Sequence, residues 1–419
     1  MTRAENTPPL ILAVTSEPPW PLDTGGRLRT FHLLRSLGQG FRVRLVTPVP
    51  RGGESLVEAL GERGIEVVPV FTGPRTLGRE ALRATAAAAR GEPYVMYRRH
   101  DRRSVRAAVR EQLRRERPDI FYLDHLDSFL YRSLAPEIPC ALDLHNVYSS
   151  LAERTAEEQS SRWRRGYLKR EARLLARSEV RAVRGADVVF AVSRDDASVF
   201  EATGARGVNV IPNGVDCEKY QELPTGRRGE APVILFVGLM SWGPNAAAAE
   251  HLARTILPSV RSRVPDARLR ILGRDPAPAV VDLAQLPGVE VTGAVPDMIP
   301  HLREAHILAA PLQSGGGTRL KILEAFAAGL PVVSTPIGCE GLGAVDGEHL
   351  IVAEREDFAD AIAGLLNDEA RGARLAEAAR RLARERFDWS AIGDSARAAL
   401  GPLIGVDRRF SNRNLASRV

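Results

Sequence analysis

A strand end, a glycine loop and a helix follow one another without a break in residues 310–331, which read APLQSGGGTRLKILEAFAAGLP. The glycines permit backbone turns that other residues cannot adopt, and the apolar spacing after them predicts a helix over Thr318–Ala328. Gly329 and Pro331 end that helix. A glycine loop that leads into a helix leaves the first N–H groups of the helix unpaired and directed at one point, an arrangement that suits a phosphate.

Three charged residues of this predicted helix extend the hypothesis of a phosphate site. Arg319 and Lys321 add positive charge at the loop. Glu324 follows the loop by about 10 Å along the helix axis, and its Cα–Cβ bond tilts back, so its carboxylate could accept both hydroxyls of a ribose whose diphosphate rests on the loop. A structural role also fits: a weak surface ion pair between Lys321 and Glu324, beside glycines that only make a turn.

The rest of the chain alternates short apolar strands with helices, a pattern typical of parallel α/β sheets. In the first half the predicted strands are Leu10–Val14, Arg42–Thr47, Ile65–Val70, Asp119–Asp124, Cys140–His145, Asp187–Val192 and Val208–Pro212. In the second half they are Val233–Val237, Leu269–Leu272, Val289–Thr292, Ile307–Ala310, Val332–Ser334 and Leu350–Val352. The predicted helices between them include one from near Arg27, a long tract over Tyr148–Arg184 and one over Asn245–Ile256. Both halves share one plan, and the sequence predicts two doubly wound, Rossmann-like sheets.

A polar segment rich in glycine, proline and arginine, Gln221–Pro232, separates the two halves and marks a domain boundary. With 419 residues the chain exceeds the size at which a single core keeps growing, which also favours two domains. We expect an N-terminal domain over 1–212 and a C-terminal domain over 213–385. We expect 386–419 to form a C-terminal helix that packs back toward the N-terminal domain, followed by a frayed tail.

The overall charge of the chain is mildly positive, with 58 Lys and Arg against 52 Asp and Glu. Much of the excess lies in two arginine-rich segments, Arg98–Arg117 and Arg162–Arg184, whose pattern is typical of solvated helix faces. Such faces could contact nucleic acid or an anionic membrane. Few aromatic residues accompany the arginines, so we expect no nucleic-acid partner, while weak peripheral association with a membrane stays open.

The three cysteines, Cys140, Cys217 and Cys339, are far apart and show neither a Cys-x-x-Cys nor a histidine spacing. No disulfide framework and no zinc site is therefore predicted. The first nine residues are polar, and Leu10–Thr15 is too short for a secretory segment or a membrane span. We expect a cytoplasmic protein, with association at the inner face of a membrane as the open alternative.

Two features at strand ends of the first half are candidates for a ligand site. Gly25 and Gly26 end the loop that follows the first strand, and His145 and Asn146 fall where a buried strand opens into a loop. Open α/β sheets bind ligands at the carboxyl ends of their strands, which favours a functional role for His145. A lone histidine is also often a structural hydrogen-bonding residue.

The chain resembles the GT-B glycosyltransferases, and specifically the retaining enzymes of glycosyltransferase family 4, over nearly its whole length. The segments that carry the resemblance are IPNGVD at 211–216, the loop and helix from Gly317 to Gly329, PVVSTPIG at 331–338 and the Phe387-x-Trp389 segment. The resemblance implies two Rossmann-like domains facing a central cleft, with a nucleotide sugar on the second domain and an acceptor on the first.

The resemblance also implies the residues of the site. Glu324 matches the second glutamate of the family's E-x7-E motif and would hold the ribose, whereas Gly316 stands at the position of the first glutamate. His145 matches the family histidine beside the transferred sugar and is the implied catalytic residue. The loop around Val295 would meet the base through its backbone. The implied substrate-binding residues are Gly25, Gly26, Asn146, Gly238, Val295, Gly316, Gly317, Thr318, Arg319, Leu320, Lys321 and Glu324.

The segment after Gly238 departs from the family pattern, because LMSWGPN at 239–245 lacks the arginine and lysine that usually neutralise the diphosphate. Our hypothesis is that Arg319 and Lys321 supply those charges. The implied reaction is retaining, metal-independent transfer of a sugar from a UDP- or GDP-sugar to a hydroxyl of a glycan, a lipid-linked acceptor or a small molecule, without a cofactor. Two alternatives are a nucleotide-sugar epimerase or hydrolase of the same fold and a noncatalytic nucleotide-sugar-binding protein.

Overall fold

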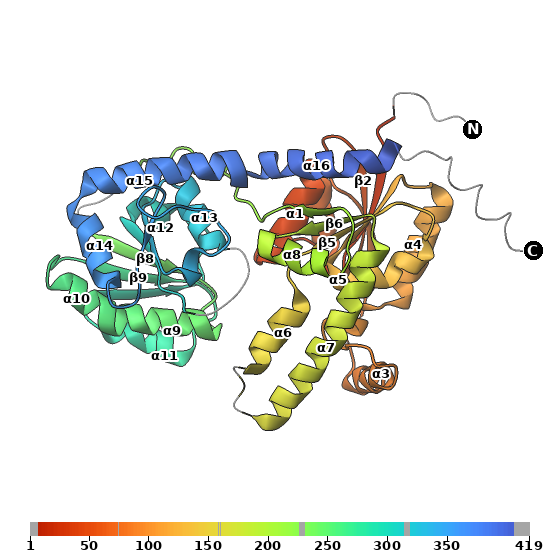
Figure 1. The fold of residues 1–419 in the computed structure, drawn as a ribbon, viewed down its shortest axis with the longest axis horizontal. Coiled ribbons are helices and arrows are strands. Elements are labelled where there is room, and N and C mark those ends of the chain that lie inside the picture. The colour runs from red at the N-terminus through yellow and green to blue at the C-terminus, as the bar shows by residue number, and fades with distance from the viewer. Residues whose placement is uncertain are drawn as a thin grey trace, which may run out of the picture. The chain divides into compact units, whose positions relative to one another are not determined.

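The computed structural model describes residues 7–73, 75–157, 159, 161–225, 231–313 and 319–405. The described residues up to Pro212, together with those from Ile392 on, form one compact unit, and Asn213–Ala391 forms the other (Figure 1). The division in the C-terminal segment thus falls inside one helix, α16 (Trp389–Gly405). Each unit is built around one parallel sheet.

The described part of the N-terminal unit contains a seven-stranded parallel sheet with the order β3-β2-β1-β4-β5-β6-β7. The predicted strands are confirmed, with small shifts at their ends: β1 Leu10–Val14, β2 Arg42–Pro50, β3 Glu66–Thr72, β4 Ile120–Asp124, β5 Cys140–Leu144, β6 Val188–Ala191 and β7 Val208–Val210. The direction of winding reverses between β1 and β4, which is where such sheets open a ligand crevice. Every residue of β1, β4 and β5 is buried, because helices cover both faces of the sheet.

The helices of this unit differ from the sequence prediction in two places. The first helix begins at Gly25 and not near Arg27, because Thr24 caps it: Thr24 Oγ1 accepts from the Arg27 N–H at 3.3 Å. The long tract expected over Tyr148–Arg184 consists of two helices, α6 and α7. The helices are α1 Gly25–Leu37, α2 Glu54–Gly61, α3 Leu77–Ala89, α4 Arg103–Arg115, α5 His125–Ser128, α6 Tyr148–Glu157, α7 Arg162–Gly185 and α8 Arg194–Ala202.

The two arginine-rich segments form α4 and α7, and each buries one apolar face. Val105 and Val109 of α4 are buried, as are Leu175 and Val183 of α7. Since the arginines lie mainly on the other faces, the prediction of helices with solvated arginine faces is confirmed.

The described part of the second unit contains a six-stranded parallel sheet with the order β10-β9-β8-β11-β12-β13. Its strands are β8 Val233–Val237, β9 Arg268–Leu272, β10 Val289–Gly293, β11 Ile307–Ala310, β12 Val332–Ser334 and β13 Ile351–Val352. Its helices are α9 Gly243–His251, α10 Leu257–Arg261, α11 Pro278–Val281, α12 Ile299–Glu304, α13 Leu320–Ala327, α14 Phe358–Asn367 and α15 Glu369–Leu382. Here the winding reverses between β8 and β11, so both units follow the same doubly wound plan.

Two helices of this unit start or stop elsewhere than predicted. The helix expected over Asn245–Ile256 starts at Gly243, with Pro244 in its first turn, and ends at His251 before a π-helical turn. The helix expected from Thr318 is described from Leu320. Short helical turns complete the chain at Arg98–His100, Phe129–Leu134, Glu218–Tyr220, Leu252–Ile256, Asp282–Gln285, Ile337–Cys339 and Ala383–Phe387.

No helix among the residues placed in the structure combines the length and the apolar character that crossing a bilayer requires. The three cysteines are free thiols, and Cys140 and Cys217 are buried. The cytoplasmic location stays a prediction.

Candidate functional site

The carboxyl ends of β4 and β5 bring one carboxylate and two histidines together. Asp124 ends β4, His125 follows it directly, and His145 follows β5. Asp124 Oδ2 lies 2.7 Å from His125 Nδ1, and Asp124 Oδ1 lies 3.1 Å from His145 Nε2. The two imidazole rings stack with their centroids 3.6 Å apart. A single buried carboxylate therefore orients both rings.

His125 has a strained backbone. Its φ of 66° lies in the left-handed region, which a non-glycine residue enters at a cost of about 1–3 kcal/mol. Such strain persists where the surroundings impose it, and it is enriched at functional sites. His125 was not predicted as a site residue, although it has the same feature as His145, because both are histidines directly after a buried strand.

Gly26 of α1 lies opposite the free edges of both rings. A Cβ placed on Gly26 would lie 3.6 Å from His125 Nε2 and 3.6 Å from His145 Nδ1, the two nitrogens that do not bond Asp124. Within the described residues, His145 Nδ1 is buried without a hydrogen-bond partner. A side chain at this position would contact both nitrogens, whereas glycine leaves them uncovered on that side.

The surroundings of His125 decide which group its free nitrogen offers to a ligand. Burial by itself lowers the pKa of His125, but the charge of Asp124 and the hydrogen bond to it outweigh burial and raise that pKa to about 9. A protonated His125 donates through Nε2. The same histidines outweigh burial in holding the pKa of Asp124 well below its usual range. Asp124 Oδ1 meets His145 at Nε2, which leaves Nδ1 as the ring nitrogen of His145 without a partner among the described residues.

The three side chains also place one potential metal ligand each within 4.8 Å of one another. A metal ion there would have to displace hydrogen bonds, because each carboxylate oxygen of Asp124 already meets a ring nitrogen. A protonated His125 is not a metal ligand. Hydrogen bonding to a substrate suits this arrangement better than metal binding.

A buried ion pair supports the histidines from behind. Arg29 of α1 is fully buried, and its Nη2 lies 2.6 Å from Asp143 Oδ1. Tyr122 donates its hydroxyl to Asp143 Oδ2 at 3.0 Å, and that oxygen lies 3.5 Å from His145 Nε2. Arg29 Nη1 also donates to the carbonyl of Ile211 at 2.7 Å. Arg29 thus ties α1 to β5 and to the end of the N-terminal unit.

Replacing Arg29 by methionine is expected to destabilise the protein by about 3–5 kcal/mol, because buried Asp143 loses its compensating charge. Arg27→Met, on the same helix, is the matched control. Arg27 pairs with Glu17 and Asp23 near the surface, so its loss is expected to change stability by about 1 kcal/mol or less. Urea denaturation measures both variants. If both variants lost the same small free energy of unfolding, the structural role of Arg29 would be contradicted.

In the second unit, Lys321 of α13 reaches the carboxyl end of β8. Its Nζ donates to Asn245 Oδ1 at 2.9 Å and lies 4.7 Å from the ring centroid of Phe236. Asn245, at the start of α9, donates its own Nδ2 to the carbonyl of Leu239 at 3.0 Å. A Cβ on Gly238 would lie 2.5 Å from Asn245 Nδ2, so glycine is needed there to admit the asparagine.

These contacts place Lys321 beside the segment after Gly238, which lacks the arginine and lysine that the resemblance implied. The loop between β8 and α9 contains no lysine or arginine, but the ammonium group of Lys321, from α13, contacts Asn245 at the start of α9. Burial, and then the charge of Arg319, lower the pKa of Lys321 to about 7. An anion placed beside Lys321 would favour its charged form.

Arg319 is directed elsewhere. It is buried, and its Nε and Nη2 donate to the carbonyl of Ile337 at 3.3 Å and 3.0 Å. Its charge lies near Lys321, but its hydrogen bonds stabilise the turn at Ile337–Cys339. The structure therefore gives the two predicted cations different environments.

Glu324 lies one turn after Lys321 and is half-buried. Its Oε1 accepts from the hydroxyl of Tyr220 at 3.4 Å, and burial raises the pKa of its carboxyl group. Tyr220 lies in a helical turn shortly after the first unit ends, so its contact with Glu324 was not predicted.

The remaining predicted residues have less defined surroundings. Gly316, Gly317 and Thr318 lie outside the described residues. Leu320 is the first residue of α13. The first backbone hydrogen bond at this end of the helix is donated by the N–H of Ile322 to the carbonyl of Arg319, at 2.8 Å, so the N–H of Leu320 lies before it. The other predicted residues occupy these places: Gly25 at the start of α1, Asn146 half-buried beside His145, and Val295 partly buried against the core of the second unit.

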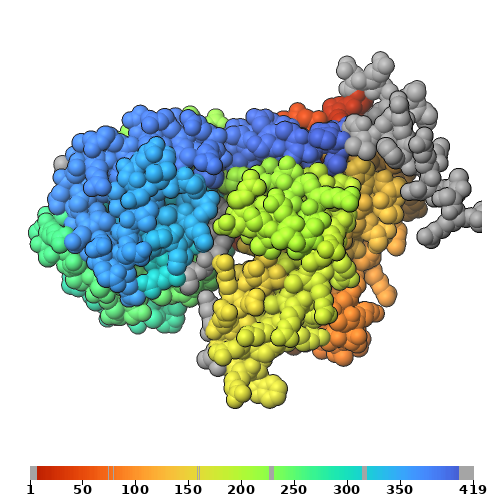
Figure 2. Space-filling model, viewed as in Figure 1, coloured from red at the N-terminus to blue at the C-terminus, as the bar shows by residue number. Residues whose placement is uncertain are grey.

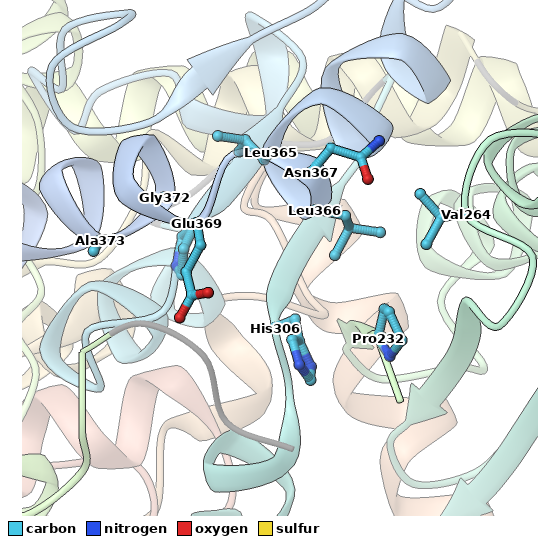
Figure 3. A pocket seen from close by; sticks show the side chains of 10 residues that line it. Pro232, Val264, His306, Leu365, Leu366, Asn367, Glu369, Gly372 and Ala373 are labelled. Atoms are coloured by element: carbon cyan, nitrogen blue, oxygen red, sulfur yellow. The ribbon is translucent and has the colours of Figure 1, made fainter. Parts of the chain in front are cut away.

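A pocket of about 210 Å³ in the second unit lies away from these residues (Figure 3). Pro232, His306 and Pro331 line it, and each directly precedes a strand. The pocket is therefore at the amino ends of the strands. Because parallel sheets bind ligands at the carboxyl ends, this pocket is not a candidate nucleotide site.

Two family models match the chain, one in each half. Residues 33–219 match the model described as Glycosyltransferase Family 4, and residues 231–368 match the model described as Glycosyl transferases group 1. Each half of the chain is therefore similar to a glycosyltransferase domain.

Known proteins resemble the chain in sequence and in fold. A phosphatidyl-myo-inositol mannosyltransferase of Mycolicibacterium smegmatis is 31% identical over 202 residues, which are 46% of this chain and 51% of that protein. The chain thus spans about half the length of that relative. A glycogen synthase of Mycobacterium tuberculosis is 24% identical over 405 residues, covering 91% of this chain and 92% of that enzyme.

The crystal structure of HepE from Anabaena in complex with UDP has a TM-score of 0.65 at 17% identity, covering 94% of this chain and 99% of that one. This likeness shows the fold. The predicted fold class, two Rossmann-like α/β domains with the GT-B fold, is confirmed.

Proposed function

We propose that this protein is a retaining, metal-independent glycosyltransferase that moves a sugar from a UDP- or GDP-sugar to a hydroxyl group of an acceptor. The observation that carries the proposal is α13, which presents a cation, Lys321, and a carboxylate, Glu324, on successive turns at the ligand-binding edge of its sheet. A nucleoside diphosphate carries the complementary groups, two phosphates and a ribose diol.

In this proposal the second unit holds the nucleotide. Lys321 meets the diphosphate as a point charge, and the first N–H groups of α13, those of Leu320 and Lys321, add donors to the same anion. Glu324, oriented by Tyr220, accepts the ribose hydroxyls. Arg319 contributes its charge at longer range, since its guanidinium bonds Ile337.

The N-terminal unit contributes His125 and His145. His145 Nδ1 accepts a hydrogen bond from a hydroxyl of the transferred sugar or the acceptor, and protonated His125 donates to an oxygen that gains negative charge. The bond between the anomeric carbon of the sugar and the diphosphate breaks while the new glycosidic bond forms on the same face, and the leaving phosphate takes the proton of the acceptor hydroxyl. The protein therefore acts by orienting the reactants and stabilising charge, and needs no covalent nucleophile.

The acceptor in this proposal is a compound with a free hydroxyl group. The names of two relatives suggest two different classes of acceptor. The names of the mannosyltransferase and the glycogen synthase refer to a phosphoinositide and to a polysaccharide. We propose a glycan or a lipid-linked acceptor. Release of nucleoside diphosphate only when donor and acceptor are both present supports transfer. Release without acceptor would indicate a hydrolase, and binding without release would indicate a noncatalytic protein.

Removal of divalent cations is expected to leave the rate of transfer unchanged. Lysine and helix N–H groups neutralise the diphosphate here, and Asp124 is already hydrogen-bonded to both histidines. Transfer is measured after dialysis against EDTA and again after adding Mg²⁺ or Mn²⁺. A strict dependence on either ion would contradict a metal-independent mechanism.

A further inference from the structure

The first two turns of α7, with the end of α6 beside them, form the end of a helical hairpin that extends from the N-terminal unit (Figures 1 and 2). We call the exposed residues of these turns the α7 tip. Trp163 is 91% exposed and Tyr167 is 47% exposed. The exposed cations of the tip are Arg162, Arg164, Arg165, Lys169 and Arg170.

Contacts inside the protein do not account for this composition. A helix N-terminus favours acidic side chains, but the first turn of α7 has none and carries arginines. Ser161, at the N-cap, makes no side-chain capping bond, so N–H groups of the first turn stay available. Trp163 makes little use of its large apolar surface, because nearly all of it faces solvent.

The cations of the α7 tip are mostly unpaired. Arg165 donates to the carbonyl of Gln159 at 2.7 Å, and Arg170 lies 3.4 Å from Glu171 Oε1. Among the residues that the structure places, no carboxylate forms an ion pair with Arg162, Arg164 or Lys169. The neighbouring helix α6 exposes Glu153 and Glu157, which reduce the positive charge of the hairpin without neutralising it.

We propose that the α7 tip docks on the surface of an anionic lipid bilayer, with Trp163 and Tyr167 at the level of the headgroups and the cations against lipid phosphates. Tryptophan and tyrosine favour this interface because their rings are apolar and their N–H and O–H groups are polar. Arginine and lysine beside them attract anionic headgroups while their aliphatic stems lie against the apolar region.

The shape of the tip favours a bilayer over a protein partner. A protruding helix end needs a matching concave surface on a rigid partner, whereas lipid headgroups rearrange around it. Docking is independent of the proposed transferase activity. It would bring the N-terminal unit to a surface that carries lipid-linked hydroxyl compounds.

Vesicle co-sedimentation tests the proposal with the full-length protein. We expect binding to vesicles of phosphatidylcholine with one third phosphatidylglycerol, little binding to pure phosphatidylcholine, and weaker binding as salt is raised. Replacing Arg162, Arg164 and Arg165 by glutamine is expected to lower the affinity roughly 100-fold, at about fivefold per cation. The matched control replaces Arg110, Arg115 and Arg117, exposed arginines of and after α4, by glutamine and is expected to keep wild-type affinity.

Trp163 provides a second, local readout. Its fluorescence is expected to shift to shorter wavelength on anionic vesicles, and Trp163→Phe is expected to abolish the shift. The proposal is overturned if the α7 variant binds vesicles as the wild type does, if the α4 control loses as much affinity, or if Trp163 emission does not move. Binding of a single-stranded oligonucleotide through the same arginines, without vesicle binding, would also overturn it in favour of nucleic acid.

Discussion

Replacing His145 by alanine is expected to lower kcat for sugar transfer about 100- to 10,000-fold, the range found when a positioned proton-transfer or hydrogen-bonding group is removed. The physical reason is geometric. His145 Nδ1 is buried, unpaired within the described residues, and directed past Gly26, while its Nε2 is held by Asp124 at 3.1 Å. Steady-state kinetics with saturating donor and acceptor measure the effect.

His125→Asn separates the charge of His125 from its strained backbone. Asparagine tolerates the left-handed conformation better than most residues, so the fold is expected to survive while the imidazolium is lost. We expect a smaller loss, about 10- to 100-fold in kcat, because His125 assists through charge and orientation. His301→Ala, in the second unit, is the control and should retain activity. Full turnover in His145→Ala, with unchanged thermal stability, would contradict the site.

Lys321→Met is expected to lower kcat about 100- to 1,000-fold, the effect of removing one donor that stabilises developing negative charge. It should also weaken binding of the nucleoside diphosphate, while binding of the corresponding nucleoside, which has no phosphates, is expected to stay within about twofold. Calorimetry with both ligands measures the difference. Asn245→Ala is expected to lower kcat and diphosphate affinity in the same way but by less. The alanine removes the oxygen that accepts from Lys321 Nζ at 2.9 Å, so the ammonium group stays present but is no longer held in place.

Arg254→Met is the control for the Lys321 variant. It removes one cation from the same unit, at an exposed position paired with Glu250, and is expected to leave both affinities unchanged. If Lys321→Met weakened nucleoside and nucleoside diphosphate equally, the charge would not be acting on the phosphates. If it weakened neither, the hypothesis of a relocated cation would be wrong, although the fold assignment would stand.

The affinity for nucleoside diphosphate is expected to fall as pH rises above about 7. The pKa of Lys321 in the empty protein is about 7, and a bound diphosphate raises it by favouring the ammonium form. Below pH 7 the lysine is already charged. Between the two pKa values, binding takes up one proton, so Kd rises about tenfold per pH unit. Lys321→Arg stays charged and should flatten this dependence relative to the wild type.

The fold was largely accessible from local sequence patterns. Runs such as Leu10–Val14 and Val233–Val237 are apolar throughout because both faces of a parallel strand are buried, and their bounds were predicted without error. Helix ends were less accessible. The start of α1 depends on a single capping contact of Thr24. At the other end of a helix, α9 is followed by a π-helical turn that no sequence pattern predicted.

The site was accessible only in part. Glu324, Lys321 and His145 could be selected because each stands at a motif or a strand end. Their hydrogen-bond partners could not be selected in this way. Asp124, which contacts His145, and Asn245, which contacts Lys321, lie in other segments of the chain, and the order of the strands brings them together. The strain at His125 is likewise a property of the backbone, which composition does not encode.

The sequence by itself determined two parallel α/β sheets, the candidate site residues at the carboxyl ends of their strands, and the charged helix after the glycine loop. Each of these follows from the spacing of neighbouring residues. Only the tertiary structure decided that one carboxylate orients two histidines, that Lys321 contacts Asn245 whereas Arg319 donates to Ile337, and that Trp163 faces solvent. Those outcomes depend on contacts between segments that are remote in the chain. The strength of each hydrogen bond and charge interaction depends on how deeply folding buries the groups that form it.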